Sequence, residues 1–186
     1  MDALDLLLTR ESALKLESPG PDEADLEVMF QSAVRAPDHG RLRPWQFVVV
    51  PEDKRAAFGE LLAASMARRM PAASAEDLAR ERGKAMRAPV IVVAAAKLAK
   101  GHKIPESEQL LSAGAAVENI ILAANARGYG AMWKTGAPAY DAVVKQALGI
   151  APDSEIVGFL YLGTQVGDGV QIPRPVAKDF VSVWAG

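Results

Sequence analysis

The spacing of apolar residues along the chain predicts several amphipathic helices. Apolar positions that recur three and four residues apart place one face of a helix against a core. This pattern predicts a short helix capped by Asp2, a helix from Asp22 to about Val34, one that opens at Pro51, and helices over 106–127 and 141–148. Gly128 suits the position just after the long helix, where a positive φ is common.

Uninterrupted apolar runs predict the strands. They cover 46–50, 89–96, a short run through Met132 and Trp133, and 156–163. The runs at 89–96 and 156–163 show no polar alternation, so both faces of these strands should be buried. Residues 68–87 are charged and rich in Ala, and we expect a loop and a solvated helix there.

The longest helix and the C-terminal segment both suggest self-association. The helix over 106–127 is apolar on nearly all sides, with small residues from Ser112 to Ala116, which suits the centre of a fold or of an oligomer. Residues 164–186 form a Pro-containing arm with an apolar, β-like run over 180–184. Because such an arm buries little surface alone, we expect it to add a strand to a partner's sheet.

The composition narrows the class of protein. A chain of 186 residues, half of them apolar, suits one domain with a sizeable core. The net charge of −2 gives no reason to expect a nucleic-acid or membrane partner. The absence of Cys excludes disulfides and thiol chemistry, and two histidines, His39 and His102, make a His-rich metal centre unexpected. Without a signal peptide or a membrane-spanning run, we expect a cytoplasmic protein.

A loop that leads into the first apolar strand carries the densest candidate chemistry. Between Ala36 and Pro44 it combines Pro, Gly, Asp, His and Arg, and Trp45, which we expect in the core, directly precedes the strand. Loops anchored on a rigid element commonly carry function. Arg35 and His39 can stabilise negative charge on a bound ring, although a loop His also commonly bonds a backbone carbonyl.

Two further places offer groups that suit a phosphorylated, planar cofactor. Arg10 and Ser12 follow the first helix, where an Arg fork and a hydroxyl can bind a phosphate. A solvated Arg and a capping Ser would show the same pattern. Trp133, Lys134 and Thr135 stand at a strand end, where open α/β sheets commonly collect ligands. An ordinary exposed Lys in a turn is equally consistent with that position.

Several catalytic signatures are absent from the sequence. No G-x-G-x-x-G motif follows a strand, and neither G-x-x-x-x-G-K-[ST] nor G-x-S-x-G occurs. No cluster of carboxylates suggests a metal site. Tyr140 and Tyr161 are the candidates for an acid, but no spacing supports either.

Taken together, these motifs resemble those of the FMN-dependent nitroreductase family, and most of all its minimal bacterial NAD(P)H nitroreductases. The resemblance covers nearly the whole chain, and its order and spacing make it specific. It rests on residues 10–12, 36–39, 44–47, 102–105 with Glu108 and Gln109, 112–115 with Asn119, 128–136 and 158–163.

The resemblance implies an α+β sandwich with a central mixed β-sheet flanked by helices. It further implies one domain over 1–186, active as an intertwined homodimer, with the arm over 164–186 exchanged onto the partner subunit. FMN would lie at each subunit interface as the cofactor, with NAD(P)H as a transient co-substrate.

The resemblance also implies eight cofactor-binding residues: Arg10, Glu11, Ser12, Arg35, His39, Trp133, Lys134 and Thr135. By analogy with the family, Arg10, Ser12 and Lys134 would hold the phosphate of FMN, with Glu11 contributing its backbone.

The flavin ring would be contacted by the other four. Arg35 and His39 would reach it from the partner chain, and Trp133 and Thr135 would line the same pocket. No catalytic side chain is expected, because the cofactor carries the chemistry.

This chain departs from the family pattern near the expected cofactor. Glu11 stands where many members have a basic residue, and it subtracts positive charge. Leu14 stands where many have a Lys that touches the pyrimidine edge of the flavin. Arg35, His39 or Arg41 would then have to supply the charge that Leu14 cannot.

The expected activity is ping-pong hydride transfer from NAD(P)H through FMN to a nitroaromatic, a quinone or a similar acceptor. Three alternatives remain open at this stage. The same fold can carry another reaction, such as dehalogenation, flavin cleavage or alkene reduction. The chain can be a flavin carrier or sensor without turnover, or a dimeric scaffold without a cofactor.

Overall fold

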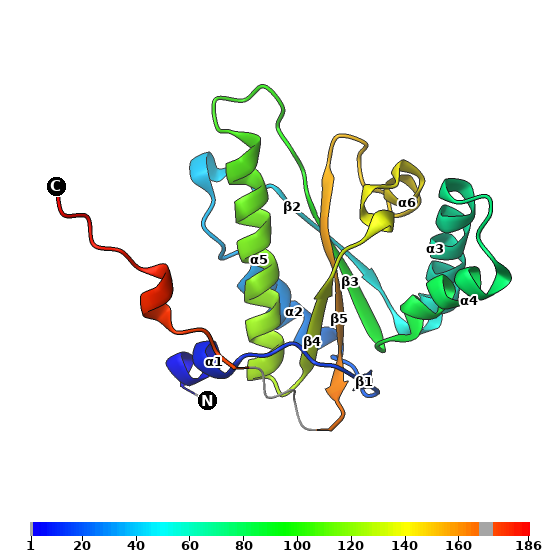
Figure 1. Ribbon diagram of the computed structural model, residues 1–186, viewed down its shortest axis with the longest axis horizontal. Coiled ribbons are helices and arrows are strands. Elements are labelled where there is room, and N and C mark those ends of the chain that lie inside the picture. Colours follow the sequence, from blue (N-terminus) through cyan, green and yellow to red (C-terminus); the bar gives the residue numbers. More distant parts are fainter. Residues whose placement is uncertain (1, 168–172) are drawn as a thin grey trace.

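A five-stranded sheet forms the centre of the molecule (Figure 1). The computed structural model describes residues 2–167 and 173–186. The strands are β1 (Leu16–Glu17), β2 (Trp45–Val50), β3 (Val90–Ala96), β4 (Gly130–Lys134) and β5 (Glu155–Gln165). Their order is β1-β5-β3-β2, and β4 pairs with β5. β5 therefore lies inside the sheet, between β3 and β4.

Helices cover both faces of this sheet. They are α1 (Ala3–Thr9), α2 (Glu23–Ala33), α3 (Arg55–Arg69), α4 (Ala75–Gly83), α5 (Glu106–Ala126) and α6 (Ala142–Ala147). α2 and α5 lie on one face, whereas α3, α4 and α6 lie on the other (Figure 1). The predicted α+β sandwich is confirmed.

The prediction of a mixed sheet is wrong for the single chain. All four strand pairings among the described residues are antiparallel. The long helix α5 returns the chain so that β4 runs parallel to β3. However, β5 inserts between these two strands and pairs antiparallel with both.

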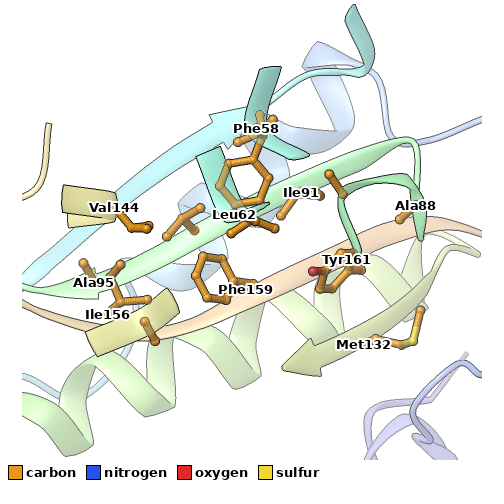
Figure 2. Packing of buried hydrophobic residues seen from close by; sticks show 14 of the residues in the cluster. Phe58, Leu62, Ala88, Ile91, Ala95, Met132, Val144, Ile156, Phe159 and Tyr161 are labelled. Carbon is orange, nitrogen blue, oxygen red and sulfur yellow. The ribbon is translucent and has the colours of Figure 1, made fainter. Parts of the chain in front are cut away.

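Two hydrophobic cores result from the alternation of side chains along the inner strands. On the α3 and α6 face, Phe58 packs against Phe159 with ring centroids 6.0 Å apart, and Tyr161 lies in the same layer (Figure 2). On the α2 and α5 face, Leu160 packs in the second core. All residues of β3 are buried, as its apolar run predicted.

The local signals for helix ends are confirmed. The carboxylates of Asp2, Asp22 and Asp141 each accept a backbone N–H in the first turn of their helix. Gly128 follows the end of α5 with φ 88°. The charged segment 68–87 contains the end of α3, a loop and α4.

The C-terminal arm begins later than predicted, because β5 continues through Gln165. Residues 168–172 of the predicted arm lie outside the described residues. Residues 173–186 project away from the sheet and include one 3-10 turn, Ala177–Phe180 (Figure 1). The β-like run over 180–184 forms no strand within this chain, and its Trp184 is 90% exposed.

Trp133 lies across a glycine on the neighbouring strand. Its indole Nε1 donates to the carbonyl of Val157 at 3.1 Å. A Cβ placed on Gly158 would lie 2.1 Å from that nitrogen and 3.1 Å from the carbonyl oxygen of Lys134. Only the absence of a side chain at Gly158 therefore permits this position of the indole.

An ionic cluster joins α2 to the end of α5. Tyr129 Oη donates to Asp25 Oδ2 at 2.6 Å, and Arg127 Nε donates to Asp25 Oδ1 at 2.6 Å. The hydrogen bonds from Tyr129 and then Arg127 hold the pKa of Asp25 below its ordinary value of 3.8. The charged form of this carboxylate therefore stabilises the folded protein.

We expect Gly158→Ala to lower the free energy of unfolding by about 1–3 kcal/mol, because the new methyl group overlaps the indole of Trp133. In a Trp133→Leu background the same change should cost much less. Urea unfolding of the four proteins measures both differences. An equal loss in the two backgrounds would contradict the steric explanation.

We expect Asp25→Asn to lower the melting temperature at pH 7. Because the pKa of Asp25 is lower in the folded state, its contribution is complete above the unfolded pKa and is lost as the pH falls through the folded value. The difference between wild type and variant should therefore be constant from pH 7 to about 5 and should shrink below about pH 4. Thermal melts across this range test the sign, and a difference that grows in acid would refute it.

Candidate functional site

The N-terminal segment that carries Arg10 is tied to β4. The N–H of Ala13 donates to the carbonyl of Ala131 at 2.9 Å. Arg10 ends α1, and its Nε lies 3.4 Å from a carboxylate oxygen of Glu118 on α5. Its side chain remains 28% exposed, so the guanidinium is accessible.

Arg10 and Glu11 border one small cavity of about 180 Å³. Glu11 Oε1 accepts a hydrogen bond from Gln165 Nε2 at 3.1 Å, so its carboxylate is engaged at the end of β5. Arg174 from the arm donates to the carbonyls of Thr9 and Arg10 at 3.2 and 2.9 Å. The start of the described arm thus meets the predicted cofactor segment.

Lys134 borders a different cavity, of about 430 Å³. Leu14 and Met132 supply apolar wall, and Lys15 and Arg87 add two cations. Lys15 pairs with Glu17 at 2.5 Å. Within the described residues, Lys134 and Arg87 have no ionic partner.

Trp133 and Lys134 face opposite sides of β4, because side chains alternate along a strand. Trp133 pairs with Leu160 in register and is 37% exposed. Ser12 and Thr135 are exposed, and their hydroxyls make no hydrogen bond to the part of the chain that the structure describes. The two hydroxyls are therefore available to bind a ligand.

The loop between α2 and β2 separates Arg35 from His39. Arg35 borders a cavity of about 680 Å³ on one side. His39 borders another, of about 360 Å³, where its Nδ1 lies 2.6 Å from Glu108 Oε2. The predicted core position of Trp45 is confirmed, since its indole is half-buried and donates to Ser112 Oγ at 3.0 Å.

The predicted residues therefore form two groups in one chain. One group lies around the ends of α1 and β4, and the other lies on the loop before β2. No cavity identified among residues 2–167 and 173–186 is lined by members of both groups. Within the first group, Arg10 and Lys134 border separate cavities, and Ser12 borders neither of them.

Sequence reasoning missed several charged neighbours of these residues. They are Lys15 and Arg87 beside Lys134, Glu118 beside Arg10, and Glu108 beside His39. Arg87 lies in the segment that we expected only to cover the core, and no local signal marks its approach to β4.

Neither Tyr140 nor Tyr161, the two candidate acids, offers an accessible acid within the site. Tyr161 is buried in the core, and this burial raises the pKa of its phenol. Tyr140 is exposed and borders none of the cavities described above. In the described part of the chain no three His, Asp or Glu side chains gather to hold a metal ion. No helix there is both long and apolar enough to cross a membrane.

Comparisons with known proteins agree with this architecture. The model of the family described as "Nitroreductase family" matches residues 7–164. A protein of Escherichia coli K12, provisionally named NAD(P)H nitroreductase YdjA, is 38% identical over 180 residues, covering 94% of this chain and 96% of its own length.

Two solved structures share the fold. The nitroreductase-like family protein of Bacillus cereus superposes with a TM-score of 0.84 at 20% identity, over 100% of this chain and 97% of the other. A mutant of NfnB, an FMN and NADPH-dependent nitroreductase of Sphigopyxis sp. strain HMH, superposes with a TM-score of 0.80 at 20% identity, over 100% of both chains. On the family match and the identity to YdjA, this chain belongs to the nitroreductase family.

Proposed function

We propose that the protein is an FMN-dependent oxidoreductase that uses NAD(P)H to reduce a nitroaromatic, a quinone or a similar acceptor. Its family membership supports this proposal, as do the names of YdjA and NfnB. The observation that carries it is the set of free cations and hydroxyls around the end of β4. Such donors suit a phosphorylated cofactor.

The phosphate of FMN is assigned to the segment that follows α1. Ser12 lies in the sequence between Glu11, which borders the cavity of Arg10, and Leu14, which borders the cavity of Lys134, so a phosphate on this segment could draw on cations of both cavities. Glu11 contributes its backbone, since its carboxylate already bonds Gln165. The Arg10 guanidinium would exchange its contact with Glu118 for a doubly charged phosphate.

The flavin ring is assigned to the end of β4 and to a second subunit. Trp133 presents a flat, partly exposed surface there, and Thr135 presents a hydroxyl. Arg35 and His39 share no cavity with these residues in one chain, and a second copy would supply them. The arrangement supports a site at the interface of a homodimer.

Three surfaces support the homodimer. The outer face of α5 exposes Leu111 by 73% beside Gly114, where an added Cβ meets no atom within 4 Å. β2 stands at the edge of the sheet with one side unpaired within the described residues. We propose that the exposed run over 180–184 adds a strand to the partner's sheet. Residues 1–186 then form one domain whose C-terminal arm packs on the partner subunit.

Bound at this site, FMN would supply hydride transfer between NAD(P)H and the second substrate in a ping-pong cycle. The side chains bind and orient rather than exchange protons. The cations Arg10, Lys134 and Arg35 favour an anionic ligand, and the buried phenol of Tyr161 takes no part. We propose the same cycle, and a cytoplasmic location, for this chain.

The experiment that tests this function is an anaerobic titration. The purified protein should bind FMN, and NAD(P)H should bleach the flavin band. Subsequent addition of a nitroaromatic or a quinone should restore the absorption band of the oxidised flavin. Flavin that binds but stays oxidised would favour the alternative of a carrier or sensor, and turnover with other acceptors would indicate a different reaction on the same fold.

We expect Arg10→Ala to weaken FMN binding at least about tenfold, because a charge-assisted bond to the phosphate is lost and Glu118 is left without its partner. Fluorescence titration measures this affinity. Arg82→Ala is the matched control, since Arg82 also pairs with a Glu of a neighbouring helix, Glu60. Glu118→Gln should bind FMN as well as wild type or better. Equal affinity in Arg10→Ala and wild type would refute the assignment.

We expect Gly114→Glu to dissociate the homodimer, because a charged side chain would enter the close approach of two α5 helices. Gly83→Glu is the matched control, since Gly83 is also a helical glycine with open space around it. Analytical ultracentrifugation measures the mass of both variants. A Gly114→Glu variant that remains as dimeric as the control would argue against this interface.

A further inference from the structure

A cluster of unpaired cations surrounds the cavity on the Arg35 side of the α2–β2 loop. The cavity measures about 680 Å³, and its lining includes Arg35, Arg41, Arg43, Lys97, Trp45 and Phe47. The four cationic side chains are exposed. None has a hydrogen-bonded or ionic side-chain partner within residues 2–167 and 173–186.

The carboxylate that borders this cavity, Asp38, carries one negative charge against the four positive charges of the cluster. Asp38 Oδ1 accepts the N–H of Leu42 at 3.1 Å, and Oδ2 accepts the N–H of Arg43 at 2.8 Å. These bonds hold Arg41 and Arg43 at φ 55° and 49°, in the left-handed region that L residues rarely adopt. The loop therefore accepts a strained backbone while it presents both guanidinium groups at one cavity.

Positive charges around one cavity repel each other, and a bound anion would reduce this repulsion. Arginine forks and a lysine match the oxygens of a phosphate. Trp45 and Phe47 of β2 add an aromatic wall, against which a nucleobase can stack. The volume is in the range of pockets that bind nucleotide-sized ligands.

The position of the cavity narrows the ligand further. Under the proposed function, Arg35 and His39 are assigned to the flavin, so this cavity adjoins the flavin at Arg35, and its other cations, Arg41, Arg43 and Lys97, extend the positive charge beyond that contact. A nicotinamide dinucleotide that delivers hydride to that flavin carries its phosphates on the part of the molecule away from the reacting ring. The phosphates of such a reductant therefore require cations that lie next to the flavin-binding residues.

We propose that this cavity binds the phosphate groups at the adenosine end of the reductant, including a 2′-phosphate, so that the enzyme prefers NADPH to NADH. Arg41, Arg43 and Lys97 are the residues that make this distinction. The identity of the ligand rests on the proposed function, whereas the location of its binding site rests on the cation cluster.

The test is calorimetric binding of adenosine 2′,5′-bisphosphate and of adenosine 5′-monophosphate to the FMN-treated protein. The double variant Arg43→Asn/Lys97→Ala removes two charges at residues that are not assigned to FMN, and Asn tolerates the left-handed backbone at position 43. Lys100→Ala is the control, since Lys100 is an exposed cation that borders none of the described cavities. FMN affinity and sedimentation are measured for each protein.

We expect wild type to bind the bisphosphate at least about tenfold more tightly than the monophosphate. The double variant should lose this difference, whereas Lys100→Ala should retain it, and FMN affinity should be unchanged. The ratio of kcat/KM for NADPH over NADH should fall in parallel.

Three results would overturn the proposal. One is equal binding of the two nucleotides by wild type. Another is a double variant that loses FMN but keeps the bisphosphate, which would assign the cavity to the flavin phosphate. The third is a double variant that becomes monomeric with unchanged nucleotide binding, which would assign it to a second copy. A protein that binds the bisphosphate but never FMN would refute the proposed function and leave the phosphate site standing.

Discussion

The pairing of β5 with a strand on each side is the constraint on which the rest of the structure depends. β3 and β4 satisfy its backbone from both edges, and two helical layers bury its side chains from both faces. Burial on this scale leaves little freedom for the register, because a shift of one residue would exchange the two cores. The end of β4, with Trp133 and Lys134, is positioned by that register.

The loop before β2 illustrates a second kind of constraint. Here one carboxylate, Asp38, organises the backbone through two short-range hydrogen bonds. On this loop Arg35 and His39 border different cavities although they are four positions apart, so one loop can contact two different ligands.

The sequence predicted the features that depend on neighbouring residues, but it did not predict which strands pair with one another. The helix starts at Asp2, Asp22 and Asp141 depend on a carboxylate and the next few residues, and the apolar runs depend on their own composition. The insertion of β5 between β3 and β4 depends on residues far apart along the chain. The motifs predicted Arg10 and Lys134 as cofactor residues, but they did not predict the contact with Glu118 or the nearness of Arg87.

The short strand β1 has a consequence for how the protein is made. Leu16 pairs with Gln165, and Ala13 bonds Ala131, so the segment that follows α1 takes its place only beside strands synthesised much later. Contacts of such sequence separation form slowly, because closing a long loop costs entropy before any contact compensates for it. The segment that follows α1 therefore cannot form these pairings until β4 and β5 have been synthesised.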